Sequence, residues 1–149
     1  MDDLASVLRE HKVAAGSVAI VWLEQSHFVF KTASGLLVHV DPFLSRTVKP
    51  EKHLRARPFL EPDRAPADLV FLTHDHRDHT DPDTLVPMAR TSPACRFVGP
   101  RESCERLRSL GIDSARIAPI REGASMSFAG FSARAVYAEN TSEHDRTTH

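Results

Sequence analysis

The sequence predicts a single α/β domain over residues 1–149, and two features of its pattern indicate that class. Three short apolar, β-branched segments with brief polar links precede residue 41, which is typical of an antiparallel meander. From residue 68 onward, short apolar segments alternate with segments of helical spacing, which is typical of α/β domains. We therefore expect a mixed, mainly antiparallel sheet with flanking helices.

The first 41 residues are expected to form one helix and three strands. Apolar residues Leu4, Val7 and Leu8 follow the spacing of one helical face within residues 2–12. Strands are expected over the β-branched and apolar residues 16–23, 27–32 and 36–40. Asp41-Pro42 ends the third strand, because proline cannot donate to a sheet ladder.

A long loop and a series of alternating elements are expected after proline 42. Residues 43–66 are rich in proline and charge, so they predict a loop with one helical turn near residues 51–57. Asp81-Pro82 provides an N-cap and a first-turn proline for a helix that runs to about Arg90. The remaining expected elements are strands at 68–73, 96–98, 116–120, 124–128 and 131–138, and a helix at 100–110.

Composition excludes several classes of protein. The chain is 41% hydrophobic and 26% charged with a net charge of −1, so no basic surface for nucleic acid is indicated. No run approaches the roughly 20 apolar residues of a membrane span, and the charged N-terminus lacks a signal-peptide core. Cys95 and Cys104 read as two reduced thiols, so the expected location is the cytoplasm.

Three histidines and two aspartates are concentrated in His74-Asp75-His76-Arg77-Asp78-His79, directly after the strand expected at residues 68–73. Imidazole nitrogens and carboxylate oxygens are ligands for zinc, manganese and iron. In extended backbone His74 and His76 point the same way, so both could reach one ion. Asp78 and His79 could complete that ligand shell or hold a second ion. The alternative is a solvated polar loop, which does not explain the alternation of histidine with aspartate.

The run from Thr73 to His79 resembles the signature of the metallo-β-lactamase fold. Residues 22–32 and 35–44 resemble the branch that includes L-ascorbate-6-phosphate lactonase-like hydrolases, and residues 143–147 are a weaker match to the same branch. The resemblance implies an αββα sandwich of which this chain is the N-terminal half. It also implies that a bridging aspartate and a final histidine would come from a second half, so the domain is expected to be truncated unless another chain completes the site.

The resemblance also implies roles for individual residues. His74 and His76 would bind a first metal ion and Asp78 and His79 a second. Apart from the resemblance, the hydrolytic mechanism would use Asp78 or a neighbour to handle the proton. Asp41 would orient a ligand imidazole, although a plain strand-to-turn aspartate is an equal alternative. Further candidates for a histidine ligand are His144 and His149.

Other residues receive simpler interpretations. Trp22 and the phenylalanines at 28, 30, 43 and 71 are expected in the core, and His27 and His39 are expected to be structural. The basic residues of the long loop could bind a phosphorylated substrate or be solvated; they are Arg46, Lys49, Lys52, Arg55 and Arg57.

The sequence thus predicts a lactonase-like hydrolase with one or two divalent ions, zinc or manganese first and iron as an alternative. Hydroxide would attack the carbonyl of a small-molecule substrate. Two alternatives stay open: a phosphodiesterase or nuclease on the same fold, and a non-catalytic metal-binding module. No membrane partner is expected, and an incompletely covered sheet makes a homo-oligomer a further expectation.

Overall fold

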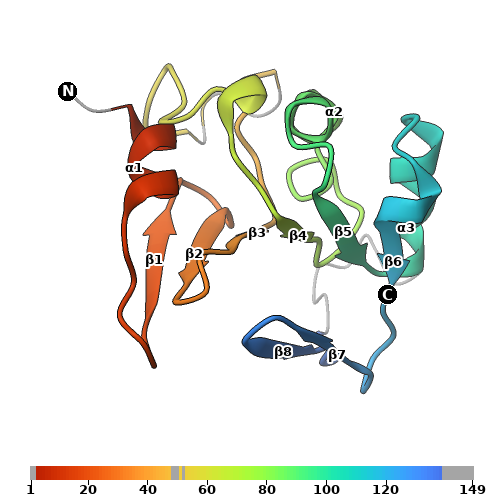
Figure 1. Cartoon of the computed structure of the whole chain (residues 1–149). Helices are drawn as coiled ribbons and strands as arrows, with labels where there is room; N and C mark the ends of the chain where they lie inside the picture. The colour runs from red at the N-terminus through yellow and green to blue at the C-terminus, as the bar shows by residue number, and fades with distance from the viewer. Residues whose placement is uncertain (1–2, 48–50, 52, 139–149) are drawn as a thin grey trace.

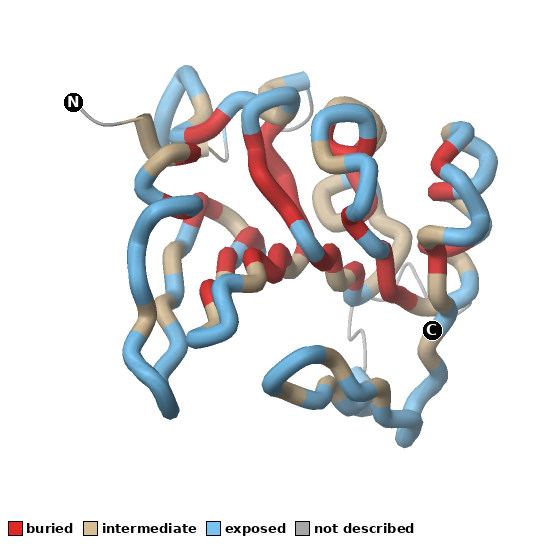
Figure 2. The backbone as a smooth tube through the Cα atoms, viewed as in Figure 1, coloured by how far each residue is buried: buried red, intermediate tan, exposed pale blue. Residues whose placement is uncertain are grey.

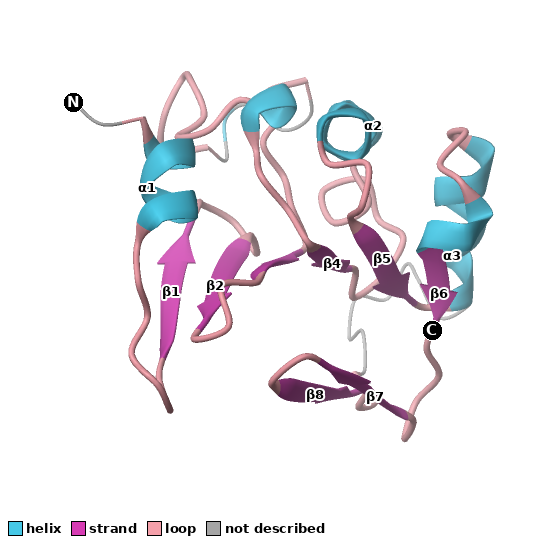
Figure 3. Ribbon diagram, in the orientation of Figure 1, coloured by secondary structure: helices cyan, strands magenta, loops and turns pink. Residues whose placement is uncertain are grey.

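A six-stranded sheet with helices on one face forms the body of the protein. The computed structural model describes residues 3–47, 51 and 53–138. The strand order is β1-β2-β3-β4-β5-β6, and a separate two-stranded hairpin, β7-β8, lies on the opposite face from the helices (Figures 1 and 3). The α/β class predicted from the sequence is confirmed.

The first half of the sheet is the expected antiparallel meander. Strands β1 (Val18–Trp22), β2 (Phe28–Thr32) and β3 (Leu37–Val40) pair in sequence order. Helix α1 (Leu4–Glu10) packs on β2, where the ammonium of Lys31 donates to the carbonyls of Leu8 and Arg9 at 2.5 and 2.7 Å. These contacts satisfy carbonyls at the C-terminal end of α1, which have no partner within the helix.

The second half of the sheet is parallel. Strands β4 (Leu69–Phe71), β5 (Arg96–Gly99) and β6 (Ile117–Pro119) follow β3, connected by helices α2 (Pro82–Thr91) and α3 (Arg101–Ser109). Short 3₁₀ helices occupy Pro62–Arg64 and Ser114–Arg116. The sheet is mixed as expected, but it is not mainly antiparallel, because β3, β4, β5 and β6 pair in parallel. The crossover connections through the long loop, α2 and α3 return each chain segment in the same direction.

The main core lies between the helices and the sheet. Leu8 of α1, Met88 of α2 and Leu107 of α3 are buried against sheet residues such as Val70 and Phe97. Figure 2 shows this interior as buried stretches along the central strands and the sheet-facing sides of the helices. The core also holds His27 and His39, whose rings contact each other through Nε2 and Nδ1 at 2.9 Å. Their expected structural placement agrees with this burial.

The opposite face of the sheet is only partly covered. The hairpin β7 (Ser125–Phe128) and β8 (Phe131–Arg134) packs there, with Phe71 and Phe128 edge to face at 5.6 Å between centroids. Strand β8 is shorter than the expected 131–138. A hollow of about 600 Å³ remains between the hairpin and the sheet, and Val18 and Phe30 contribute to its lining.

The predicted core position is therefore wrong for two of the aromatic residues. Trp22 is 51% exposed and Phe28 37% exposed, because both lie at the end of the sheet that the hairpin does not cover. Phe43 is buried, and Phe30 and Phe71 are half-buried in the apolar cluster between the sheet and the hairpin. The turn expected near residues 51–57 is confirmed only at its start, because residue 51 is in a 3₁₀ turn and residues 54–57 form bends. In the described part of the chain, no helix is long and apolar enough to cross a membrane.

Candidate metal centre

The histidine cluster and Asp41 lie at one edge of the sheet. Strands β3 and β4 are parallel, with Val40 paired to Phe71, so their carboxyl ends lie side by side. The amide of Asp41 donates to the carbonyl of Phe71 at 2.9 Å, which fixes the start of one loop against the end of the other strand. Residues that follow the two strands therefore meet although the sequence separates them by more than thirty positions.

Asp41 contacts two residues of the adjacent loop. Its Oδ1 accepts from the amide of Thr73 at 2.8 Å, and its Oδ2 accepts from the hydroxyl of Thr73 at 2.7 Å. The same Oδ2 lies 2.8 Å from Nδ1 of His79. A ring that donates from Nδ1 presents Nε2 as its lone-pair nitrogen, the arrangement in which a carboxylate orients a metal-binding imidazole. The role predicted for Asp41 remains a prediction, and this contact supports it.

The three imidazoles of the cluster are gathered. The ring centroids of His74 and His79 are 3.9 Å apart, and those of His74 and His76 are 4.5 Å apart. The hydroxyl of Thr73 lies between them, 3.0 Å from His74 Nδ1 and 3.4 Å from His79 Nδ1. No role was predicted for Thr73 from the sequence, although its place directly before the cluster could have indicated one.

The protonation of His74 suits a metal ligand. Burial lowers the pKa of His74 below its ordinary value, and the neighbouring His79 and His76 lower it further, while Asp41 and Asp78 oppose the change. Neutral imidazole is the form that binds metals, so the surroundings of His74 favour the required form near neutral pH.

The donor atoms are nevertheless not yet arranged around a common point. Among residues 3–47, 51 and 53–138, no group of three or more His, Cys, Asp or Glu side chains is positioned to hold one ion. The donor types fit zinc, manganese or iron. Binding of an ion at this cluster would therefore require side-chain rotation within it. His144 and His149 lie outside the described residues.

Helix α2 anchors the far end of the cluster. Asp81 is its N-cap as predicted, accepting from the amide of Asp83 at 3.3 Å and from the hydroxyl of Thr84 at 2.6 Å. The hydroxyl oxygen of Thr84 in turn accepts from the amides of Leu44 and Ser45 at 2.9 and 3.0 Å. The start of the long loop is thus bound to the helix that ends the cluster.

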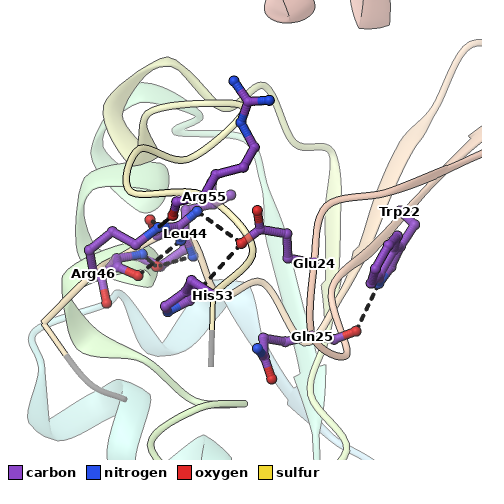
Figure 4. A network of polar contacts seen from close by, with 9 residues as sticks. Trp22, Glu24, Gln25, Leu44, Arg46, His53 and Arg55 are labelled. Atoms are coloured by element: carbon purple, nitrogen blue, oxygen red, sulfur yellow. Dashed lines mark hydrogen bonds and ion pairs between the residues drawn. The ribbon is translucent and has the colours of Figure 1, made fainter. Parts of the chain in front are cut away.

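A second polar network organises the long loop at the same edge (Figure 4). Glu24, buried in the β1–β2 turn, accepts at Oε2 from Arg46 at 3.1 Å and lies 3.3 Å from Nδ1 of His53. Arg46 also donates to the carbonyls of Leu44, Ser45 and Arg55. These contacts engage the Arg46 guanidinium within the protein, which weakens its candidacy as a phosphate ligand.

Of the other basic residues of the long loop, one contacts an aromatic ring and two lie outside the described residues. Arg55 lies over the ring of Phe59 at 4.7 Å. Lys49 and Lys52 lie outside the described residues. Thr47 donates to Asp83 at 2.7 Å, and Asp83 also pairs with Arg77 of the cluster at 3.1 Å. The long loop is therefore linked to the histidine cluster through the first turn of α2.

Comparison with known families identifies the architecture. The model of the beta-lactamase superfamily domain matches residues 37–149, which includes β3, Asp41 and the whole histidine cluster. The chain belongs to this family. Its fold is accordingly of the metallo-β-lactamase type, with the described residues supplying one helical layer, one sheet and a hairpin on the sheet's other face.

Relatives in this superfamily are hydrolases by name. A UPF0173 metal-dependent hydrolase of Cupriavidus taiwanensis is 29% identical over 87% of this chain and 44% of its own length. A second UPF0173 metal-dependent hydrolase, of Polynucleobacter asymbioticus, is 29% identical over 66% of this chain and 33% of its own length. The chain thus spans less than half the length of the curated relatives it matches.

Solved structures show the same fold. A Parabacteroides distasonis protein assigned as a metal-dependent hydrolase superposes with a TM-score of 0.60 at 20% identity, over 85% of this chain and 48% of its own. CmlA, a diiron beta-hydroxylase of Streptomyces venezuelae, gives 0.53 at 19% identity, over 76% and 22% of the two chains. At these identities the likeness is one of fold.

Proposed function

We propose that this chain carries the metal-binding part of a hydrolase, with His74, His76, Asp78 and His79 as the residues that hold one or two divalent ions. The observation that carries the proposal is that three imidazoles lie together at the carboxyl edge of the sheet. One of them, that of His79, lies within hydrogen-bond distance of the carboxylate of Asp41. Names of relatives from the same superfamily support the reaction class.

A bound divalent ion would lower the pKa of a coordinated water to about 7 and so supply a hydroxide nucleophile near neutral pH. The protein's own groups would orient the ligand rings, through Asp41 and Thr73, and keep His74 neutral. Asp78 would transfer the proton. We propose zinc or manganese first, with iron as the alternative, and a small-molecule substrate in the cytoplasm.

For the substrate we propose a lactone, whose carbonyl carbon would be attacked. Arg46, one of the basic loop residues considered as phosphate ligands, is engaged by Glu24 and three carbonyls. A phosphodiester substrate is therefore the second arm of the test. A non-catalytic metal-binding module is the third.

The test starts from chelator-treated chain reloaded with zinc, manganese or iron(II). Elemental analysis after gel filtration should show at least one ion per chain, and His76→Ala should lose most of it while His11→Ala, at an exposed position, retains it. Metal-loaded chain should then hydrolyse simple lactones faster than bis(p-nitrophenyl) phosphate. Absence of retained metal in the wild-type chain would contradict the proposal, and retained metal without hydrolysis of either substrate would favour the module.

A further inference from the structure

Two consecutive peptide groups between His74 and His76 are each held by a side chain from elsewhere in the structure. The hydroxyl of Thr80 donates to the carbonyl of His74 at 2.7 Å. The guanidinium of Arg106, in helix α3, donates from Nη1 to the carbonyl of Asp75 at 2.6 Å. Because each peptide group is planar, fixing both carbonyls fixes the backbone turn at Asp75 between the two imidazoles. The backbone separation between the two histidines therefore depends on Thr80 and Arg106.

The rest of the loop is held by its own backbone. The amides of His79 and Thr80 both donate to the carbonyl of His76, at 2.9 and 2.7 Å, which closes the second part of the cluster. The peptide between Asp75 and His76 is different, because its side-chain hydrogen bond comes from a residue thirty-one positions later in the sequence. Arg106 thus connects the metal-binding loop to a helix outside it.

Helix α3, which carries Arg106, is packed closely against the sheet. A Cβ on Gly99, just before the helix, would lie 3.1 Å from Cβ of Leu72 and 3.2 Å from its carbonyl oxygen, so glycine allows the close approach. Ser103 and Leu107 on the same helix are fully buried, and Ser103 Oγ lies 3.2 Å from the hydroxyl of Thr80. The backbone of Arg106 is therefore held at a defined position relative to the end of β4.

We propose that Arg106 is a positioning residue that raises the affinity of the loop for a divalent cation by holding the Asp75 peptide in the binding conformation before the ion arrives. The inference rests on the proposed function. Ordering one residue costs about 1–2 kcal/mol, so a loop ordered in advance binds more tightly. The positive charge of the guanidinium acts in the opposite direction, since it repels a cation. Charge alone therefore predicts tighter binding when Arg106 is removed, and positioning predicts weaker binding.

The test compares Arg106→Ala with Arg108→Ala in the full 149-residue chain. Both changes remove one positive charge from the last turn of α3, and Arg108 is exposed. Zinc affinity is measured by competition with a chromophoric chelator at fixed pH. We expect Arg106→Ala to weaken zinc binding about 10-fold, as loss of an outer-shell contact does, and Arg108→Ala to change it less than about twofold. Arg106→Lys, which keeps the charge and a donor, should recover part of the affinity.

Thermal unfolding with and without zinc separates positioning from general stabilisation. A purely structural role for Arg106 lowers the Tm of the metal-free and zinc-loaded variant equally. Positioning instead reduces the increase in Tm that zinc produces, because that increase follows from affinity. Unchanged or tighter zinc binding by Arg106→Ala would overturn the inference while leaving the proposed function intact. Failure of the wild-type chain to bind zinc would overturn both.

Discussion

Asp41 combines an unfavourable backbone with several favourable contacts. Its φ of +45° is in the left-handed region, which aspartate tolerates better than most residues but still at a cost of about 1 kcal/mol. The side chain is 2% exposed and contacts the Thr73 amide, the Thr73 hydroxyl and His79. Such strain at a candidate site is consistent with a requirement for this side chain at this position.

Asp41→Asn tests whether the carboxylate serves the candidate metal centre. Asparagine also tolerates the left-handed region and keeps one acceptor oxygen, so the metal-free chain should stay folded. It loses the negative charge beside His79, and zinc affinity should fall about 10-fold. A chelator competition titration measures the change. Asp63→Asn, at an exposed position of the 3₁₀ helix, is the matched control and should bind zinc as the wild type does. Equal affinity in the two variants would remove Asp41 from the centre.

The buried His39 predicts a loss of stability in acid. Burial lowers the pKa of His39 from 6.5 to about 4, against smaller opposing effects of the Pro66 carbonyl and Asp68. The unfolded chain therefore takes up this proton first as the pH falls below about 6.5, so the stabilisation is complete above that pH and is lost progressively toward about 4. This residue alone should lower the free energy of unfolding by about 2 kcal/mol between pH 7.5 and pH 5.

Urea denaturation of metal-free chain at the two pH values measures this effect. In His39→Gln the difference between pH 7.5 and pH 5 should shrink by about that amount, whatever the stability at pH 7.5. His11→Gln, at an exposed position, should retain the wild-type difference. A His39→Gln chain with the full wild-type pH dependence would show that other groups, such as the buried His27, dominate it.

At the residue scale, the sequence was informative where chemistry is concentrated locally. The alternation of histidine and aspartate from 74 to 79 is visible without a structure, and the rings do gather. Asp41 was detectable because it directly follows a strand. Arg106 carried no signal, because its contact with Asp75 depends on how α3 packs against β4 and not on any local pattern.

The start of α2 shows a local signal that the folded protein uses at long range. Asp81 caps the helix as Asp-Pro predicts, but its second oxygen also accepts from the hydroxyl of Thr84, which binds the start of the long loop. Asp81→Ala should therefore lower the free energy of unfolding by about 2 kcal/mol, the upper end for an N-cap. Urea denaturation is the measurement. Asp113→Ala, an exposed cap of a 3₁₀ helix, should cost clearly less, and equal costs would contradict the role of Thr84.

At the element scale, the positions of strands and helices were predictable and their pairing was not. Within the described residues, apolar runs and Asp-Pro or Gly signals located every α-helix and strand to within a few residues, apart from the longer end expected for β8, but not the two short 3₁₀ helices. The direction of β4, β5 and β6 was missed, because the apolar run of a buried strand is compatible with either pairing. Trp22 and Phe28 were misplaced for a related reason: strand composition does not reveal which face is covered.

For the molecule as a whole, the uncovered face of β1 predicts self-association. Ile20 is 57% exposed and pairs with Phe30, which borders the hollow beneath the sheet. Exposed contiguous apolar surface at a sheet edge favours contact between copies. Ile20→Lys should therefore shift the chain toward monomer in sedimentation equilibrium. Val7→Lys, on the exposed side of α1, should associate as the wild type does. A wild-type chain that stays monomeric at about 100 μM would contradict this prediction.

The connection between β3 and β4 has a consequence for the order of folding. These strands are neighbours in the sheet, yet the whole of the long loop separates them, whereas β1, β2 and β3 are joined by short turns. Closing the long loop costs more chain entropy than closing a turn, so the meander should form early and the β3–β4 pairing late. Asp41 reaches His79 only once that pairing exists. Nascent chain would therefore acquire its capacity to capture a cation near the end of folding, after the hairpins have collapsed.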